Sequence, residues 1–275
     1  MELIFGIIKL IWEFFWAIFT WFNPKRKNKR PISFAGKTCR IVTYGLNGSG
    51  KTTIIKSIIS QERLGTELPT SNFELYEGDL TLDIGRKKRL KVIFADYKGE
   101  KPSQIVFSDP ESMVAPGGEK LINALFFVVD VIPRLYRKGT SEIVQDDNTL
   151  VQWLVQDFIG RVDKRVAEHK LYITKWNIQL LFSNLLSRHF KSVRLLINKF
   201  DILEEASAQN LIELKHAELE NFARGLFSDL EQEIREACMA NGIKDFAVEV
   251  ISAKKDVRIR GMFTSAIQTY IENFS

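Results

Sequence analysis

The sequence predicts an α/β domain of three layers, in which a mostly parallel central sheet lies between helices on both faces. From about residue 32 onwards, short apolar runs typical of strands buried on both faces alternate with segments of helical periodicity. The first of these runs ends at a glycine-rich stretch that leads into an apolar-periodic segment. The hydrophobic content of 45% and the charged content of 27% are ordinary for a globular chain. We therefore expect one large domain, residues 31–275, after a separate amino-terminal segment.

Residues 1–30 are predicted to form a membrane anchor helix followed by a basic linker. The apolar stretch Leu3–Phe22 covers 20 residues, or about 30 Å as a helix, which is enough to cross the hydrocarbon core of a bilayer. Five basic residues follow it closely: Lys25, Arg26, Lys27, Lys29 and Arg30. The positive-inside rule then places residues 31–275 on the cytoplasmic side of the membrane.

The way in which this helix meets the membrane stays open. A polar stripe formed by Glu2, Lys9, Glu13 and Thr20 lies on one narrow helical face. The stripe fits a single-pass helix that faces a partner helix, and it also fits an interfacial helix. A cleaved signal peptide is disfavoured because no basic residue precedes the apolar run. The first 30 residues carry +4 of the net charge of +5, so the basicity is local and indicates a membrane surface instead of nucleic acid.

The remainder of the chain predicts six strands and a closing helix. In chain order the strands are Arg40–Tyr44, Phe73–Ile84, Leu90–Ala95, Ala124–Val129, Val193–Ile197 and Ala247–Ile251. The second strand should pair antiparallel with the third across a turn at Gly85–Lys88. The closing helix is predicted at Gly261–Phe274.

The stretch of about 134–190 contains more helical periodicity than one crossover between parallel strands requires. Apolar residues from Val151 to Val166 follow helical spacing, and a second helix is indicated between Trp176 and Phe190. We interpret the stretch as an enlarged helix or a helical hairpin inserted into the domain. It either packs against the flank of the domain or offers a surface to a protein partner.

The stretch from Cys39 to Ile59 carries the motif of a phosphate-binding loop. Residues Gly45–Thr52 read G-x-x-x-x-G-K-T between a predicted strand and a predicted helix, which is the context that the motif needs. Lys51 would reach the β- and γ-phosphates, and the Thr52 hydroxyl would bind magnesium. The loop and the helix amino terminus would surround the phosphates with backbone N–H groups. The loop residues expected to contact nucleotide are Asn47, Gly48, Ser49, Gly50, Lys51 and Thr52.

A second motif follows the third predicted strand. The sequence FADYKGE places Asp96 and Gly99 in a D-x-x-G arrangement. Asp96, at the end of the strand, can hold magnesium through water, and the Gly99 N–H can sense the γ-phosphate. The motif is short, so it supports the phosphate-binding loop without identifying the base.

Two further motifs indicate guanine. Asn198, Lys199 and Asp201 read N-K-x-D directly after the fifth predicted strand. A carboxylate at Asp201 accepts both the ring N–H and the amino group of guanine, whereas the mismatched edge of adenine leaves the carboxylate charge partly unpaired. Lys199 would lie along the base, and Asn198 would tie this loop to the phosphate loop. After the last predicted strand stands S-A-K, whose central N–H would meet the guanine carbonyl: Ser252, Ala253 and Lys254.

Together these motifs resemble those of the Ras-like small GTPase superfamily and, within it, the Arf-like group. The loop GLNGSGKTT is similar to that group's GLDGAGKTT, and LGTELPTSNFEL resembles its switch stretch. The resemblance covers roughly residues 37–133 and 191–275 and leaves out the insertion. An anchor before an Arf-like domain is similar to the arrangement of the signal recognition particle receptor beta subunit. The resemblance implies a P-loop GTPase fold.

The resemblance also implies ligands and further site residues. GTP or GDP would bind together with Mg²⁺. Thr70 would be the switch threonine that completes the magnesium shell beside Thr52 and Asp96, and Thr66 is the competing candidate. Thr53 would contact the α-phosphate.

One catalytic position departs from the family. After D-x-x-G the family has a glutamine that orients the attacking water, whereas this chain has Glu100. A carboxylate beside the γ-phosphate adds like-charge repulsion, although it can act as a base if its pKa is raised. We expect the catalytic residues to be Lys51, Gly99 and Glu100, with hydrolysis that is slow alone or depends on a GTPase-activating protein. No motif positions an internal arginine.

The expected function is a membrane-anchored, magnesium-dependent GTPase switch that faces the cytoplasm and signals to a protein effector or receptor partner. The alternative is a hydrolysis-poor GTP-binding receptor or assembly subunit, in which nucleotide stabilises an interface; Glu100 favours this alternative. A P-loop ATPase or kinase is disfavoured by the N-K-x-D and S-A-K motifs. Nothing in the sequence indicates a nucleic-acid partner.

Overall fold

The computed structural model describes residues 38–59, 73–84, 86–97, 111–133, 135 and 146–253. Its elements in chain order are β1 (Thr38–Tyr44), α2 (Lys51–Ile58), β2 (Phe73–Ile84), β3 (Arg86–Tyr97), the short 3₁₀ helix η2 (Glu111–Met113), β4 (Ala124–Asp130), α3 (Asp147–Val155), α4 (Phe158–Tyr172), α5 (Lys175–Leu185), β5 (Ser192–Asn198), α6 (Phe200–Ala208), α7 (His216–Gly225), α8 (Ser228–Ala240) and β6 (Asp245–Val250). These strands form one sheet in the order β2-β3-β1-β4-β5-β6. Only β2 and β3 pair antiparallel within this sheet. The predicted α/β architecture with a mostly parallel sheet is confirmed.

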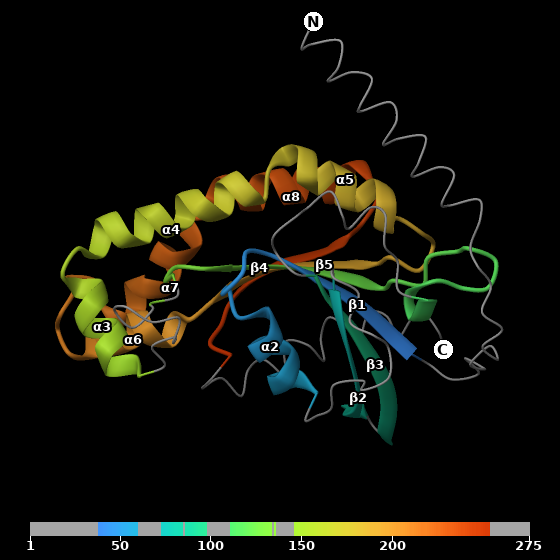
Figure 1. Ribbon diagram of the computed structural model, residues 1–275, viewed down its shortest axis with the longest axis horizontal. Coiled ribbons are helices and arrows are strands. Elements are labelled where there is room, and N and C mark those ends of the chain that lie inside the picture. The colour runs from blue at the N-terminus through green and yellow to red at the C-terminus, as the bar shows by residue number, and fades with distance from the viewer. Residues whose placement is uncertain are drawn as a thin grey trace, which may run out of the picture. The chain divides into compact units, whose positions relative to one another are not determined.

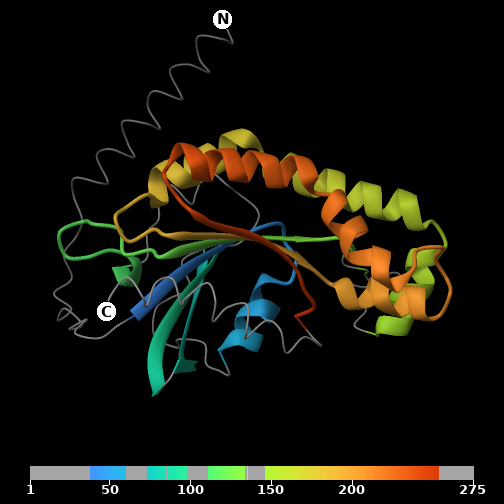
Figure 2. The same cartoon turned by 180° about the vertical axis from the view of Figure 1, so that it is seen from behind.

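The sheet is covered on both faces, as its continuous apolar strands require. Along β1, Ile41 lies in the core beside α2, whereas the next residue, Val42, lies in the core on the opposite face. Figure 1 and Figure 2 show α2 on one face and α4, α5 and α8 on the other. The helices α3, α6 and α7 gather at the end of the sheet where β4 and β5 finish. Helices therefore surround the carboxyl ends of the central strands.

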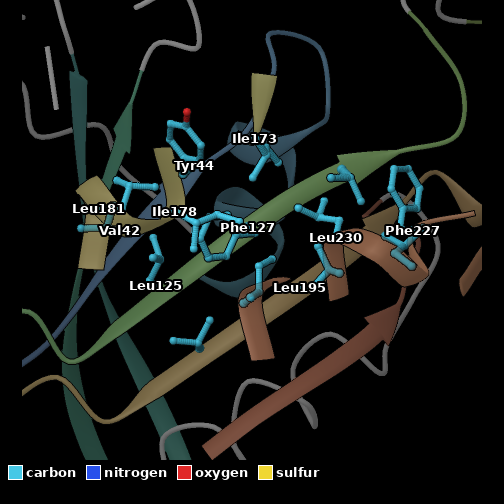
Figure 3. Close-up of a cluster of buried hydrophobic side chains, with 14 of the residues drawn as sticks. Val42, Tyr44, Leu125, Phe127, Ile173, Ile178, Leu181, Leu195, Phe227 and Leu230 are labelled. Atoms are coloured by element: carbon cyan, nitrogen blue, oxygen red, sulfur yellow. The ribbon is translucent and has the colours of Figure 1, made fainter. Parts of the chain in front are cut away.

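The core under α4, α5 and α8 is built from large apolar side chains that fit closely (Figure 3). The rings of Tyr44 and Tyr172 stack with centroids 5.0 Å apart, and Phe127 meets Tyr44 edge-on at 6.0 Å. Ile178 and Leu181 from α5 belong to the same core. Burial of each such side chain stabilises the fold by about 1.5–3 kcal/mol. Helix α4 is thus fixed directly over the end of β1, where the phosphate-binding loop begins.

Two predicted boundaries were wrong in detail. The antiparallel ladder pairs Ile84 with Arg86, so β3 begins inside the stretch predicted as a turn. The helical periodicity from Val151 to Val166 belongs to two helices, α3 and α4. The carboxylate of Asp157 accepts a hydrogen bond from the Gly160 N–H at 3.3 Å and so caps the start of α4. A local side-chain cap has interrupted a pattern that periodicity alone reads as continuous.

The second predicted helix of the insertion is α5, but its bounds differ from the prediction. α5 ends at Leu185, and Phe190 packs in the core outside the helix, against Phe182. Trp176, at the start of this helix, is 69% exposed. Three helices, α3, α4 and α5, therefore fill the described part of the stretch between β4 and β5.

Several predictions lie outside the described residues. These are the anchor and linker of residues 1–30, the closing helix Gly261–Phe274, and the site residues Thr66, Thr70, Gly99, Glu100 and Lys254. Within residues 38–253, apart from the gaps given above, no helix has the length and apolar content that crossing a membrane requires.

Candidate functional site

The predicted site residues that the structure describes converge at the carboxyl edge of the sheet. Parallel register aligns Thr43 of β1 with Asp96 of β3, and Asp130 of β4 with Asn198 of β5. From β1 the chain first builds the β2–β3 side of the sheet and then returns to build β4, β5 and β6 on the other side. Such a reversal of strand order opens a crevice at the carboxyl ends, which is where open α/β sheets bind ligands.

The phosphate-binding loop connects β1 to α2 through a tight turn. The Ser49 N–H donates to the Leu46 carbonyl at 3.2 Å, and Gly50 (φ 91°) is the residue that precedes the first turn of α2. A Cβ on Gly45 would lie 2.1 Å from the Val128 carbonyl oxygen, so only glycine fits this approach to β4. The buried Lys51 donates through Nζ to the carbonyls of Gly45 at 2.9 Å and Leu46 at 3.1 Å. The Lys51 side chain thus folds back over the phosphate-binding loop.

The remaining loop residues differ in exposure. Asn47 and Thr53 are exposed, whereas Gly48 and Ser49 are buried. The first N–H groups of α2 have no side-chain cap. An uncapped helix amino terminus that follows a glycine-rich turn is suited to binding an anion.

The predicted metal ligands Thr52 and Asp96 are in direct contact. The Thr52 hydroxyl donates to Asp96 Oδ2 at 2.7 Å, and the Thr43 hydroxyl donates to Asp96 Oδ1 at 3.2 Å. Burial raises the pKa of the Asp96 carboxyl, while the positive charge of Lys51 opposes the rise. Near Asp96, the Tyr76 hydroxyl donates to Glu74 at 2.7 Å. Asp96 is therefore a buried carboxyl group beside a lysine and two threonine hydroxyls.

These residues fit a magnesium ion that is shared with phosphates. In the part of the chain that the structure describes, no three His, Cys, Asp or Glu side chains are grouped closely enough to hold a metal by themselves. Mg²⁺ commonly takes one or two protein ligands and completes its shell with water and substrate phosphates. Thr52 and Asp96, which lie beside the uncapped start of α2, meet that requirement.

Asn198 joins the three predicted nucleotide loops. This residue is 2% exposed and ends β5. Its Nδ2 donates to the Ser49 carbonyl in the phosphate loop at 2.9 Å, and its Oδ1 accepts from the Ala253 N–H at 3.0 Å. A Cβ on Gly50 would lie 2.1 Å from Asn198 Nδ2, so the bridge depends on glycine there. The predicted tie between the N-K-x-D loop and the phosphate loop is present, and the S-A-K loop belongs to the same link.

Asp201 is the buried carboxylate of the N-K-x-D motif. It is 4% exposed and lies in the first turn of α6. Among the described residues it forms no hydrogen bond and no ion pair. The amino-terminal dipole of α6 offsets part of the cost of burying this charge. The nearby Ser252 Oγ is also buried and, within the same residues, has no hydrogen-bond partner. Both groups are suited to receive a polar ligand.

Lys199 adopts an unusual conformation and a definite set of partners. Its backbone φ of 64° is left-handed, which non-glycine residues rarely adopt and which often marks functional sites. Its Nζ donates to the Ile132 carbonyl at 2.6 Å and forms an ion pair with Asp130. These contacts fix the ammonium group of Lys199. The aliphatic part of its side chain is therefore the part that can contact a base.

Sequence reasoning missed a buried cluster next to these loops, formed by Asp130, Arg165 and His169. Arg165 Nε donates to Asp130 Oδ1 at 2.6 Å, and His169 Nε2 lies 2.6 Å from the same oxygen. Burial alone would raise the pKa of the Asp130 carboxyl, but Lys199, His169 and Arg165 together hold it below its usual range. Burial lowers the pKa of His169. The same Nε2 lies 3.1 Å from the Asp130 backbone N–H, so the imidazole nitrogen contacts both the main chain and the carboxylate of Asp130. One signal was available: Arg165 and His169 are polar residues four positions apart on the apolar face of α4.

Comparison of the chain with protein-family models and with curated proteins finds no match. The site is therefore interpreted from its own geometry.

Proposed function

We propose that this chain is a membrane-anchored GTP-binding protein of the Ras-like, Arf-like kind, with a P-loop GTPase fold and a helical insertion. It would bind GTP or GDP with Mg²⁺ and hydrolyse GTP slowly. The observation that carries the proposal is the bridge of Asn198 to Ser49 and Ala253, because it unites a phosphate-binding loop with two loops whose sequences indicate guanine. The buried carboxylate of Asp201, which has no hydrogen bond and no ion pair among the described residues, supports the same assignment.

Each group has a proposed role toward the nucleotide. Lys51 and the N–H groups at the start of α2 bind phosphate oxygens. Asp201 accepts the ring N–H and the amino group of guanine, and the Ala253 N–H meets the guanine carbonyl. Magnesium, held from the side of Thr52 and Asp96, would neutralise charge on the β- and γ-phosphates. Thr70, Gly99 and Glu100 complete the proposed switch region. The anchor of residues 1–30 would hold residues 31–275 at the cytoplasmic face of a membrane.

Glu100 favours a second candidate function. With a carboxylate in place of the family's glutamine, GTP would stay bound and stabilise an interface with a receptor or assembly partner. Single-turnover phosphate release separates the two functions, because a switch releases phosphate, alone or with an activating protein, and an assembly subunit does not.

The guanine assignment is tested by Asp201→Asn. The amide loses the second acceptor and adds a donor, so we expect GTP affinity to fall at least about a hundredfold. Xanthosine triphosphate, which carries a carbonyl in place of the guanine amino group, should bind the variant better than GTP does. Lys51→Ala is the companion variant. It should bind neither GTP nor xanthosine triphosphate, because the substitution removes a contact with the phosphates. GTP affinity that is unchanged in Asp201→Asn would refute the assignment.

A further inference from the structure

Helix α4, from the inserted stretch, places a buried arginine against the phosphate-binding loop. Arg165 is 5% exposed and lies between the buried residues Val162 and Val166. Figure 2 shows α4 on the face of the sheet opposite to α2, so the loop between β1 and α2 lies between the two helices. No motif predicts a basic residue at this place. The tertiary structure, and none of the sequence motifs, brings this arginine to the loop.

The guanidinium of Arg165 makes three contacts in different directions. Nε donates to Asp130 at 2.6 Å, and Nη1 donates to Glu168 at 2.9 Å. Nη2 donates to the carbonyl oxygen of Asn47 at 3.3 Å, across 118 residues of sequence. The planar fork of arginine can satisfy three such partners at once, whereas the single ammonium of a lysine cannot span them.

The contact with Asn47 determines the direction of a phosphate-binding group. In a trans peptide unit the carbonyl of Asn47 and the N–H of Gly48 point in opposite directions. The structure has no cis peptide bond among the residues that it describes. A donor that holds the Asn47 carbonyl from the α4 side therefore turns the Gly48 N–H away from α4. Gly48 has a φ of 86°, in the left-handed region that glycine adopts without steric cost.

The same arginine is linked to the base-recognition loop. Asp130 accepts from Arg165 and forms an ion pair with Lys199 of the N-K-x-D motif. Asp130 is fully buried, so each of these charged contacts lies in a medium of low dielectric constant, where rearrangement is costly. A chain of contacts thus runs from Asn47 through Arg165 and Asp130 to Lys199.

We propose that Arg165 is a positioning residue of the nucleotide site: it orients the phosphate loop through the Asn47 carbonyl and links that loop to the base-recognition loop through Asp130. The inference rests on the proposed function and deepens it, because it makes the inserted helix α4 part of the nucleotide site. The contacts with Asp130 and Glu168 hold Arg165 within the fold. The third contact, to an exposed residue of the phosphate loop, is the one that acts on bound nucleotide.

The test compares Arg165→Lys and Arg165→Gln with Lys164→Gln in the full-length chain purified in mild detergent. Lys164 is the matched control, because it is the exposed neighbour on α4 and its replacement removes the same charge. Two quantities are measured: the dissociation rate of fluorescent GDP and GTP, and urea unfolding without nucleotide. Arg165→Lys keeps a cation beside Asp130 but loses the hydrogen bond to the Asn47 carbonyl. Its unfolding midpoint should therefore stay close to that of the wild type, whereas nucleotide should dissociate about tenfold faster. Arg165→Gln should have a lower unfolding midpoint and should release nucleotide faster than the wild type. Lys164→Gln should match the wild type in both measurements.

Each other outcome has a definite meaning. If Arg165→Lys releases nucleotide as slowly as the wild type, or if it fails to fold, Arg165 serves only the fold and the inference is overturned. If the wild type binds ATP in place of guanine nucleotides, the guanine assignment fails alone, and the Arg165 variants are compared with fluorescent ATP. If the wild type binds neither nucleotide, the proposed function and this inference fall together.

Discussion

Replacement of Asn198 tests the link between the three loops most sharply. Asn198→Ala removes two hydrogen bonds, to the Ser49 carbonyl at 2.9 Å and from the Ala253 N–H at 3.0 Å. Each is worth about 1 kcal/mol net, and a buried partner left without a hydrogen bond costs about 1–3 kcal/mol. We therefore expect the free energy of unfolding without nucleotide to fall by about 2–4 kcal/mol. Affinity for GDP should fall at least about tenfold, because the loops are no longer held together.

Asn198→Asp is the matched control for this experiment. The aspartate keeps an acceptor for the Ala253 N–H but places an oxygen where Nδ2 donated to Ser49. The variant should therefore keep the link to the S-A-K loop and lose the link to the phosphate loop. Urea unfolding and calorimetric titration with GDP measure the two effects separately. If Asn198→Ala has wild-type stability and wild-type GDP affinity, the bridge does not organise the site and the reasoning is refuted.

Three further predictions follow from the same site. Gly50→Ala should lower the free energy of unfolding by at least about 1–2 kcal/mol in urea titrations, because its φ of 91° is unfavourable with a Cβ and that atom would lie 2.1 Å from Asn198 Nδ2; a neutral result would contradict the tight turn. Burial lowers the pKa of His169 below its ordinary 6.5, so the unfolded state binds a proton that the folded state excludes, and stability should fall as pH drops below about 6.5. Urea unfolding of His169→Gln between pH 7 and pH 5 should show a shallower fall, by up to about 1.4 kcal/mol per pH unit, and an identical slope would exclude His169 as the cause. Glu100→Gln should raise single-turnover phosphate release, since it introduces the amide that orients the attacking water in Ras-like GTPases, and no rise would count against that interpretation of Glu100.

The sheet and the loops were predictable because their signals are local. The strands β1, β4 and β5 are short, mostly apolar runs, and the phosphate-binding loop follows β1 without interruption, whereas β2 and β3 are 12-residue strands that include charged residues. Since parallel strands align their carboxyl ends, motifs after different strands were expected to converge. Asn198 and Ser49 meet for this reason, although 149 residues separate them in sequence.

The Asp130 cluster was not predictable in the same way. The helical periodicity of α4 correctly marks Val162 and Val166 as buried, and it places Arg165 on the same face without naming a partner. The partner is the last residue of β4, and its identity depends on how α4 crosses the sheet. That crossing is set by tertiary packing, such as the stacking of Tyr172 on Tyr44, which no local pattern encodes. Similarly, the break between α3 and α4 depends on one capping side chain, Asp157.

The measurement that tests the central claim most directly is a calorimetric titration of the wild-type chain with GDP and with ADP, each with magnesium. The account predicts that GDP binds at least about a hundredfold more tightly than ADP, because Asp201 and the Ala253 N–H match the edge of guanine and not that of adenine. Equal affinity for the two nucleotides, or no binding of either, would contradict it.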